Sequence, residues 1–188
     1  MTWDTLNLGS QNEVPEWQLV RFVKRTWGEN ARNPVPLEKR QSIKMLDIGP
    51  GLYQANQVFL KSKGYTVVSV DVSHTVPANI HADICDCDFP TGSFDLIYDI
   101  NTLCHVERPP VEKIYQWLKL GGYFYSICPT NDTSKDVAKG KEFTRLASLE
   151  EISDLYSCFN HLDHDERVEP RGNEKLKSWI LTGFKPWS

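Results

Sequence analysis

Short apolar runs alternate with amphipathic stretches through the middle of the chain. Runs rich in β-branched and aromatic residues predict buried strands at residues 43–48, 65–70, 79–84, 94–100 and 123–128. Apolar residues at helical spacing predict two helices between them. One spans 53–63 with Ala55, Val58, Phe59 and Ser62 inward, and one starts at Pro109-Pro110 and ends at Gly121-Gly122. Alternating strands and helices indicate a parallel sheet covered on both faces.

The flanking segments predict further elements. Residues 15–27 form an expected helix, with Pro15 in its first turn and an inward face of Trp17, Val20, Val23 and Trp27. Ser148-Leu-Glu-Glu151 is a capping-box pattern that predicts a helix start. Two last strands, near 166–169 and 177–184, are predicted to form a hairpin through Gly172-Asn173. The expected fold is therefore α/β and doubly wound, with seven strands, mostly parallel, and an antiparallel C-terminal hairpin.

Length and composition bound the organisation of the chain. With 188 residues it suits a single domain, read as an N-terminal helical extension (1–42), a core (43–128) and a substrate-side segment with the last strands (129–188). The net charge of −4 and the scattered lysines and arginines disfavour a nucleic-acid substrate. No apolar run has membrane-spanning length, so no membrane association is expected.

The cysteines favour a reducing compartment. Their number is five, and the N-terminus shows no secretory signal pattern, so a cytoplasmic location is predicted. Cys85-Asp-Cys87 with nearby His81 is a weak metal pattern, because zinc sites prefer Cys-x-x-Cys and no second ligand pair follows. No metal is expected.

Candidate chemistry gathers at the carboxyl ends of the predicted strands, where open α/β sheets bind ligands. Gly49 and Gly51 permit positive φ and a close backbone approach, and the helix that follows them favours an anionic group. Asp71 ends the second strand, where a carboxylate can accept hydrogen bonds from a ribose diol. Tyr53 stands where dinucleotide sites have a third glycine, so a nucleoside without phosphates is the better fit. Asp83 would then accept from an adenine amine.

Six motifs in order carry a family resemblance. They are Leu46-Asp-Ile-Gly-Pro-Gly51, Val68-Ser-Val-Asp71, Ala82-Asp83, Gly92-Ser-Phe-Asp-Leu96, Leu103-Cys-His-Val106 and Leu118-Lys-Leu-Gly-Gly-Tyr123. Together they resemble class I S-adenosylmethionine-dependent methyltransferases of the small-molecule type. The resemblance implies a Rossmann-like fold, S-adenosylmethionine as cofactor and a methyl acceptor. It spans roughly residues 43–128.

The resemblance also implies roles for single residues. The methionine end of the cofactor would be held by Asp47 and the backbone of Gly49, Pro50 and Gly51, with the Tyr53 ring over it. The ribose would lie against Asp71 and Val72, and the adenine against Asp83 and the Ile84 N–H. Asp99, Ile100 and Asn101 would line the sulfonium side. The link 72–82 is short and contains Pro77, so the family's helix between strands two and three should be shortened or lost.

The mechanism expected from these residues is an in-line displacement in which the protein mainly aligns the reactants. His105 is the candidate base, and its alternative role is a hydrogen-bonded residue that fixes the loop. Without a large inserted recognition segment, the acceptor is expected to be a small molecule. Three alternative functions stay open: an RNA or protein methyltransferase, a catalytically silent cofactor-binding protein, and a nicotinamide-binding reductase. Residues 130–147 are a candidate flap over the substrate, and the oligomeric state is open.

Some of these aspartates have a purely structural alternative role. Asp71 and Asp83 could each cap a turn or helix rather than bind a ligand, and Asp95 is more simply a structural residue of the fourth strand.

Overall fold

The computed structural model describes residues 13–132, 147–171 and 174–187. The chain falls into two compact units, Met1–Asp83 and Ile84–Ser188, which are described separately. The single-domain organisation expected from the length stays a prediction. None of the helices in the described ranges has the length and apolar composition needed to cross a membrane.

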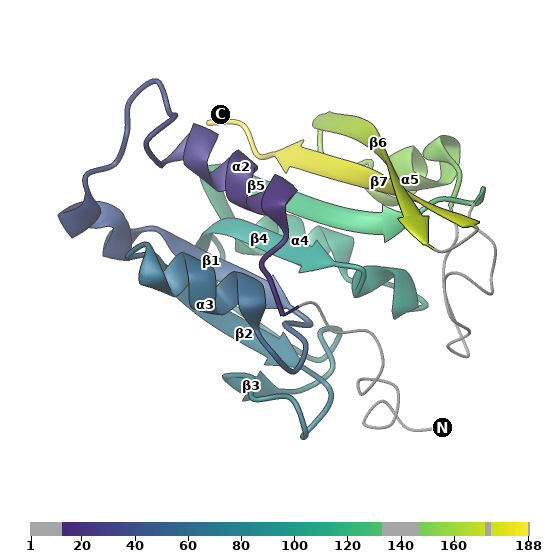
Figure 1. Cartoon of the computed structure of the whole chain (residues 1–188), viewed down its shortest axis with the longest axis horizontal. Helices are drawn as coiled ribbons and strands as arrows, with labels where there is room; N and C mark the ends of the chain where they lie inside the picture. Colours follow the sequence, from purple (N-terminus) through teal and green to yellow (C-terminus); the bar gives the residue numbers. More distant parts are fainter. Residues whose placement is uncertain (1–12, 133–146, 172–173, 188) are drawn as a thin grey trace. The chain divides into compact units, whose positions relative to one another are not determined.

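The first unit contains a three-stranded parallel arrangement with helices beside it. Strand β1 (Lys44–Ile48) pairs with β2 (Thr66–Asp71), and β2 pairs with β3 (Ile80–His81), as Figure 1 shows. The helices are α2 (Trp17–Thr26), the 3-10 helix η2 (Leu37–Ser42) and α3 (Ala55–Ser62). Because α3 joins two neighbouring parallel strands, it is the crossover of a βαβ unit, as the alternating pattern predicted.

The buried faces of both α-helices in this unit agree only in part with the predicted ones. In α2 Val23 is buried as predicted, but the other buried residue is Leu19, and Trp17 is 56% exposed. In α3 they are Gln57 and Leu60, while Val58 is 59% exposed. Apolar residues occupy several faces of these short helices, so their spacing alone did not determine which face is buried.

The third strand is much shorter than predicted. Residues 79–84 were expected to be extended, but only Ile80 and His81 pair with β2. The Asn79 side chain accepts hydrogen bonds from both the backbone N–H and the hydroxyl of Ser69, at 3.0 Å each. The expected loss of the helix between strands two and three is confirmed, since residues 72–79 contain no helix.

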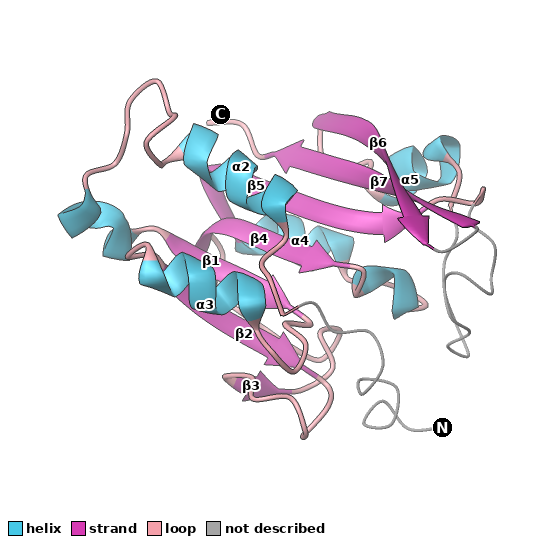
Figure 2. Ribbon diagram, in the orientation of Figure 1, coloured by secondary structure: helices cyan, strands magenta, loops and turns pink. Residues whose placement is uncertain are grey.

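The second unit contains a mixed sheet (Figure 2). Strand β4 (Phe94–Ile100) pairs in parallel with β5 (Leu118–Pro129), β5 pairs antiparallel with β7 (Glu174–Phe184), and β7 pairs antiparallel with β6 (His161–Arg171). The helices of this unit are η3 (Leu103–His105), α4 (Val111–Trp117) and α5 (Leu149–Leu155). The predicted C-terminal antiparallel hairpin is confirmed, although Gly172 and Asn173 lie outside the described residues.

In this unit the sequence predicted the start of α5 correctly and the end of α4 wrongly. The capping box is present as predicted: Ser148 Oγ accepts from the Glu151 N–H, and the Glu151 carboxylate accepts from the Ser148 N–H. The Gly121-Gly122 pair, however, does not end α4. That helix ends at Trp117, and the glycines lie in β5, where the register shifts and Gly121 has φ 77°.

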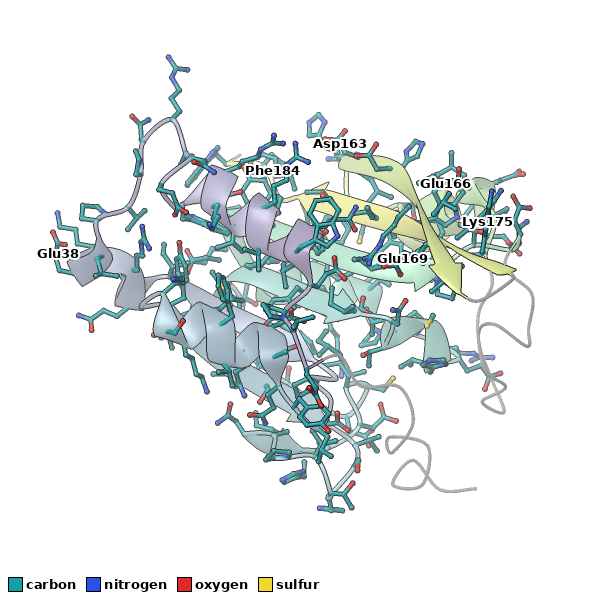
Figure 3. The ribbon with its side chains drawn as sticks, viewed as in Figure 1. Glu38, Asp163, Glu166, Glu169, Lys175 and Phe184 are labelled. Carbon is teal, nitrogen blue, oxygen red and sulfur yellow. The ribbon has the colours of Figure 1, made fainter. Side chains whose placement is uncertain are left out.

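Charged side chains protect the strand that ends the sheet of the second unit. Figure 3 shows Asp163, Glu166 and Glu169 on β6 and Lys175 on β7. An outer strand with exposed charges resists pairing with other chains. The β6–β7 hairpin is therefore a well-protected end of the sheet.

Candidate functional site

The turn after β1 leaves its backbone open to a ligand. Gly49 and Gly51 have φ 70° and 68°, a conformation that other residues seldom adopt. The Gly49 N–H donates to the Val70 carbonyl oxygen at 2.8 Å, which ties the turn to β2. A Cβ atom built on Gly51 meets no heavy atom within 4 Å. The two glycines and the intervening Pro50 thus form a tight turn with free space beside it.

The helix that follows this turn begins without a side-chain cap among the described residues. Its N-cap residue, Gln54, has φ 49° and makes no capping hydrogen bond. The Gln54 side-chain amide instead donates to the Pro77 carbonyl oxygen, and Asn56 Oδ1 accepts from the Glu16 N–H at 2.6 Å. Uncapped helix N-termini favour carboxylates and other anions. Gln54 is a residue that the sequence analysis missed, because nothing in the sequence marks a glutamine for positive φ.

The predicted binding residues of the first unit surround this turn or end the neighbouring strands. Asp47 on β1 is 2% exposed, whereas Tyr53 is 50% exposed. Asp71 ends β2, and its Oδ1 accepts from the Ser73 N–H at 2.8 Å. The turn-capping alternative for Asp71 is thus seen, although a carboxylate has capacity for further hydrogen bonds. Val72 is 43% exposed, and Asp83 is exposed at the end of this unit.

Side-chain hydrogen bonds shape the helix-free link between β2 and β3. The Thr75 N–H donates to the Ser73 hydroxyl at 3.2 Å, and the two hydroxyls lie 2.8 Å apart. His81 Nδ1 lies 3.1 Å from the Ser73 carbonyl oxygen, and its ring packs against that of His74. Together with the Asn79–Ser69 pair, these contacts fix the backbone that follows Asp71.

The predicted residues of the second unit follow β4. Asp99 is fully buried, and its Oδ1 accepts from the N–H groups of Thr102 and Leu103 at 2.9 and 3.0 Å. Burial raises the pKa of Asp99 to about 6, although Ser126 and the two N–H groups act in the opposite direction. The Ser126 hydroxyl lies on the paired strand, outside hydrogen-bond geometry, yet still favours the carboxylate.

Beyond Asp99 the chain makes a sharp turn. Asn101 has φ 57°, and its N–H donates to the Ile127 carbonyl oxygen at 2.8 Å. Asparagine tolerates the left-handed conformation better than most residues do. His105, half-buried, ends the 3-10 helix, and its N–H donates to the Thr102 carbonyl oxygen at 2.9 Å. Asp99, Asn101 and His105 are thus parts of one hydrogen-bonded turn, together with Ile100 at the end of β4.

The start of the second unit is tied to α4. Ile84 is buried, and the turn after it is held by Lys113 Nζ, which donates to the Cys85 and Cys87 carbonyl oxygens at 3.0 and 3.3 Å. Neither cysteine forms a disulfide bond. Among the residues that the structure describes, no three histidine, cysteine, aspartate or glutamate side chains gather as a metal site.

Within each unit the predicted residues are brought together, and their assignment to a cofactor stays a prediction. Asp47, Gly49, Pro50, Gly51, Tyr53, Asp71 and Val72 follow two paired parallel strands of the first unit, where Asp83 is the last residue. Asp99, Ile100, Asn101 and His105 form the turn of the second unit, and Ile84 begins that unit.

The sequence of this chain is similar to a protein family and to individual proteins of known activity. Residues 18–172 match the family described as "Methyltransferase domain". Phosphoethanolamine N-methyltransferase of Plasmodium falciparum is 26% identical over 148 residues, which are 66% of this chain and 55% of that protein. Phosphoethanolamine N-methyltransferase 3 of Arabidopsis thaliana is 26% identical over 102 residues, which are 46% of this chain and 21% of that protein. The chain thus spans only part of the length of these relatives.

Solved structures share the fold. Phosphoethanolamine N-methyltransferase 2 of Haemonchus contortus, in complex with phosphomonomethylethanolamine and S-adenosylhomocysteine, aligns with a TM-score of 0.66 and 16% identity, over 96% of this chain and 56% of that chain. The N1-methyltransferase of 1,6-didemethyltoxoflavin from Burkholderia thailandensis aligns with a TM-score of 0.59 and 18% identity, over 80% of this chain and 75% of that chain. These alignments confirm the predicted α/β fold, mostly parallel with antiparallel C-terminal strands.

Proposed function

Because this chain belongs to the methyltransferase domain family, we propose that it transfers a methyl group from S-adenosylmethionine to a small-molecule acceptor. The sulfonium supplies an electrophilic methyl group, which the acceptor attacks in line with the leaving sulfur. The protein's contribution is alignment, which is worth about 7–11 kcal/mol in well-oriented reactions.

The observation that carries this proposal is the turn between β1 and α3. Two glycines at positive φ, free space beside Gly51 and a helix start without a side-chain cap suit the amino-acid end of S-adenosylmethionine. The proposal assigns the amino group to Asp47 and the carboxylate to the backbone of Gly49–Gly51. Pro50 stiffens that backbone, because its ring fixes φ.

The nucleoside part is assigned to the residues that end β2 and follow β3. We assign the ribose hydroxyls to Asp71 beside Val72, and the adenine amine and ring to Asp83 and the Ile84 N–H. Tyr53 is half-exposed next to the glycine turn, which leaves its ring available to cover the methionine part. Ile100 and Asn101 are assigned to the sulfonium side.

For the acceptor we propose a small phosphorylated amine, which would be methylated on nitrogen. The support is the name of the relatives, phosphoethanolamine N-methyltransferases, at 26% identity. An alkylammonium must lose a proton before its nitrogen can attack. His105 is the proposed base, because histidine titrates close to neutral pH.

The first experiment measures cofactor binding and transfer separately. Isothermal titration with S-adenosylmethionine and S-adenosylhomocysteine should give saturable binding, and no binding of either at millimolar concentration would contradict the proposal. Tritiated S-adenosylmethionine should then label phosphoethanolamine, with ethanolamine and choline as controls that lack the phosphate or a methylatable nitrogen.

The other outcomes distinguish the alternatives. Label in RNA or protein but not in the phosphorylated amine would favour a macromolecular acceptor. Tight cofactor binding without label in any acceptor, including a metabolite extract, would favour a catalytically silent binding protein.

A further inference from the structure

The second unit contains a buried carboxylate, Asp99, whose hydrogen bonds reach the turn that follows it. Asp99 has no exposed surface, and its Oδ1 accepts hydrogen bonds from the Thr102 and Leu103 N–H groups. A ligand cannot touch a side chain that exposes no atom. This geometry separates Asp99 from Asn101 and His105, which are exposed and half-buried.

A carboxylate at this position is costly, since burial disfavours the charged form. Its hydrogen bonds to two N–H groups offset that cost, because an ionised acceptor forms stronger bonds than a neutral one. These N–H groups stand at the beginning of η3, where helical turns leave donors without intrahelical partners. Asp99 therefore fastens the start of the short helix that ends in His105.

The turn needs such a fastening because it contains a strained residue. Asn101 lies between Asp99 and η3 with φ 57°, a conformation that costs free energy and persists only where neighbouring contacts hold it. Its N–H is held from β5 by the Ile127 carbonyl oxygen, while Asp99 holds the two residues that follow. Both sides of Asn101 are thus fixed.

From these contacts we infer that Asp99 is a positioning residue for methyl transfer: it holds the Asn101–His105 turn in its reactive conformation and does not contact the cofactor. This inference rests on the proposed function and replaces the sequence-based assignment of Asp99 to the sulfonium side. Displacement of a reacting group by about 1 Å costs about a hundredfold in rate. Loss of the Asp99 acceptor should therefore reduce turnover much more than cofactor affinity.

The test compares four variants with the wild-type protein. Asp99→Ala removes the acceptor, Asp99→Leu is a second removal that keeps a side chain of similar shape without any acceptor, and Asp99→Asn keeps an oxygen that can accept from the same N–H groups. Asp95→Ala is the matched control. It removes a carboxylate from the other end of β4, where Asp95 Oδ2 accepts from Lys119 Nζ at 2.7 Å.

Four measurements are made on each variant. Amide hydrogen exchange follows the Thr102 and Leu103 N–H groups, the NMR shift of the His105 ring follows the end of the turn, and titration gives the S-adenosylmethionine affinity. The rate of methyl transfer to phosphoethanolamine completes the set. Asp99→Ala and Asp99→Leu should lose exchange protection, shift the His105 resonance and slow transfer at least tenfold, with cofactor affinity within about threefold of wild type. Asp99→Asn should restore most of the rate, and Asp95→Ala should change none of the local signals.

Several results would overturn the inference. One is a normal transfer rate, or an unshifted His105 resonance, in folded Asp99→Ala or Asp99→Leu. Another is cofactor affinity that falls as much as the rate, because this would indicate direct contact with the cofactor. A wild-type protein that binds no S-adenosylmethionine would instead overturn the proposed function, and this inference with it.

Discussion

At the scale of single residues, the carboxylates after the parallel strands differ in their surroundings. Asp71 is partly exposed and accepts a hydrogen bond from the Ser73 N–H, whereas Asp99 is fully buried. A partly exposed carboxylate can bind a ligand, and a buried one acts through the groups that it holds. The two acids should therefore respond differently to substitution.

Asp71→Ala should weaken S-adenosylmethionine binding by about 1–3 kcal/mol, because it removes a charged acceptor from the ribose hydroxyls. The measurement is isothermal titration of the folded variant. Asp71→Asn is the control, since its amide oxygen can still accept from the Ser73 N–H but carries no charge. An unchanged dissociation constant for Asp71→Ala would refute this placement of the ribose.

Asp99 should make stability depend on pH. Its folded-state pKa, about 6, lies above the value of about 3.9 expected in the unfolded chain, so the folded state binds more protons between these values. The free energy of unfolding should fall, relative to Asp99→Asn, as pH rises from about 4 to about 6, and level off above that. The free energy of unfolding should change by about 1.4 kcal/mol for each unit by which the folded-state pKa differs from the unfolded-state pKa. Parallel urea titrations of the two proteins across this pH range would measure it, and a constant difference would contradict the raised pKa.

At the scale of elements, α5 depends on its capping box. Ser148→Ala should lower the free energy of unfolding by about 0.5–2 kcal/mol, because the Glu151 N–H loses its acceptor. Ser153→Ala is the matched control in the same helix. Ser153 is exposed, and its hydroxyl only donates to the Leu149 carbonyl oxygen, so its removal should be nearly neutral. If denaturant titrations gave both variants the same loss in free energy of unfolding, the capping box would not stabilise α5 as predicted.

The sequence predicted the strands better than the buried faces of the helices, for a physical reason. The strands that end at Ile48, Asp71 and Ile100 were predicted well, because apolar, β-branched and aromatic residues dominate each of them. The buried face of α3 was predicted wrongly, since Gln57 rather than Val58 is inside. In an eight-residue helix, packing decides which side is covered, and periodicity is too short to show it.

The candidate site shows the same limit. Gly49 and Gly51 predicted the turn after β1, because glycine is the residue that most readily adopts positive φ. The left-handed conformation of Gln54 has none, and the role of Asp99 depends on N–H groups that only the folded turn brings within reach. Backbone donors carry no residue identity, so a sequence cannot show which carboxylate will hold them.

At the scale of the whole molecule, the methyltransferase family and the fold predicted from six ordered motifs are confirmed, whereas S-adenosylmethionine as the cofactor is part of the proposed function. The cytoplasmic location and the single-domain organisation stay predictions. Cofactor binding should stabilise the protein, because a ligand that binds only the folded state adds about 2.7 kcal/mol at a hundred times its dissociation constant. The melting temperature should rise with S-adenosylmethionine and S-adenosylhomocysteine concentration, and ATP should serve as the inactive control. Equal shifts with ATP would contradict a site for a nucleoside without phosphates.

The helix-free link between β2 and β3 has a consequence for how this lineage can change. A helix is held by main-chain bonds that most sequences can form, so it tolerates gradual drift. This link instead depends on the identities of Ser69, Ser73 and Asn79, whose side chains hold it. Loss of one of these side chains should therefore disturb the whole link, because no repetitive backbone pattern supports it. We expect the three residues to be retained together in related chains that keep this short link.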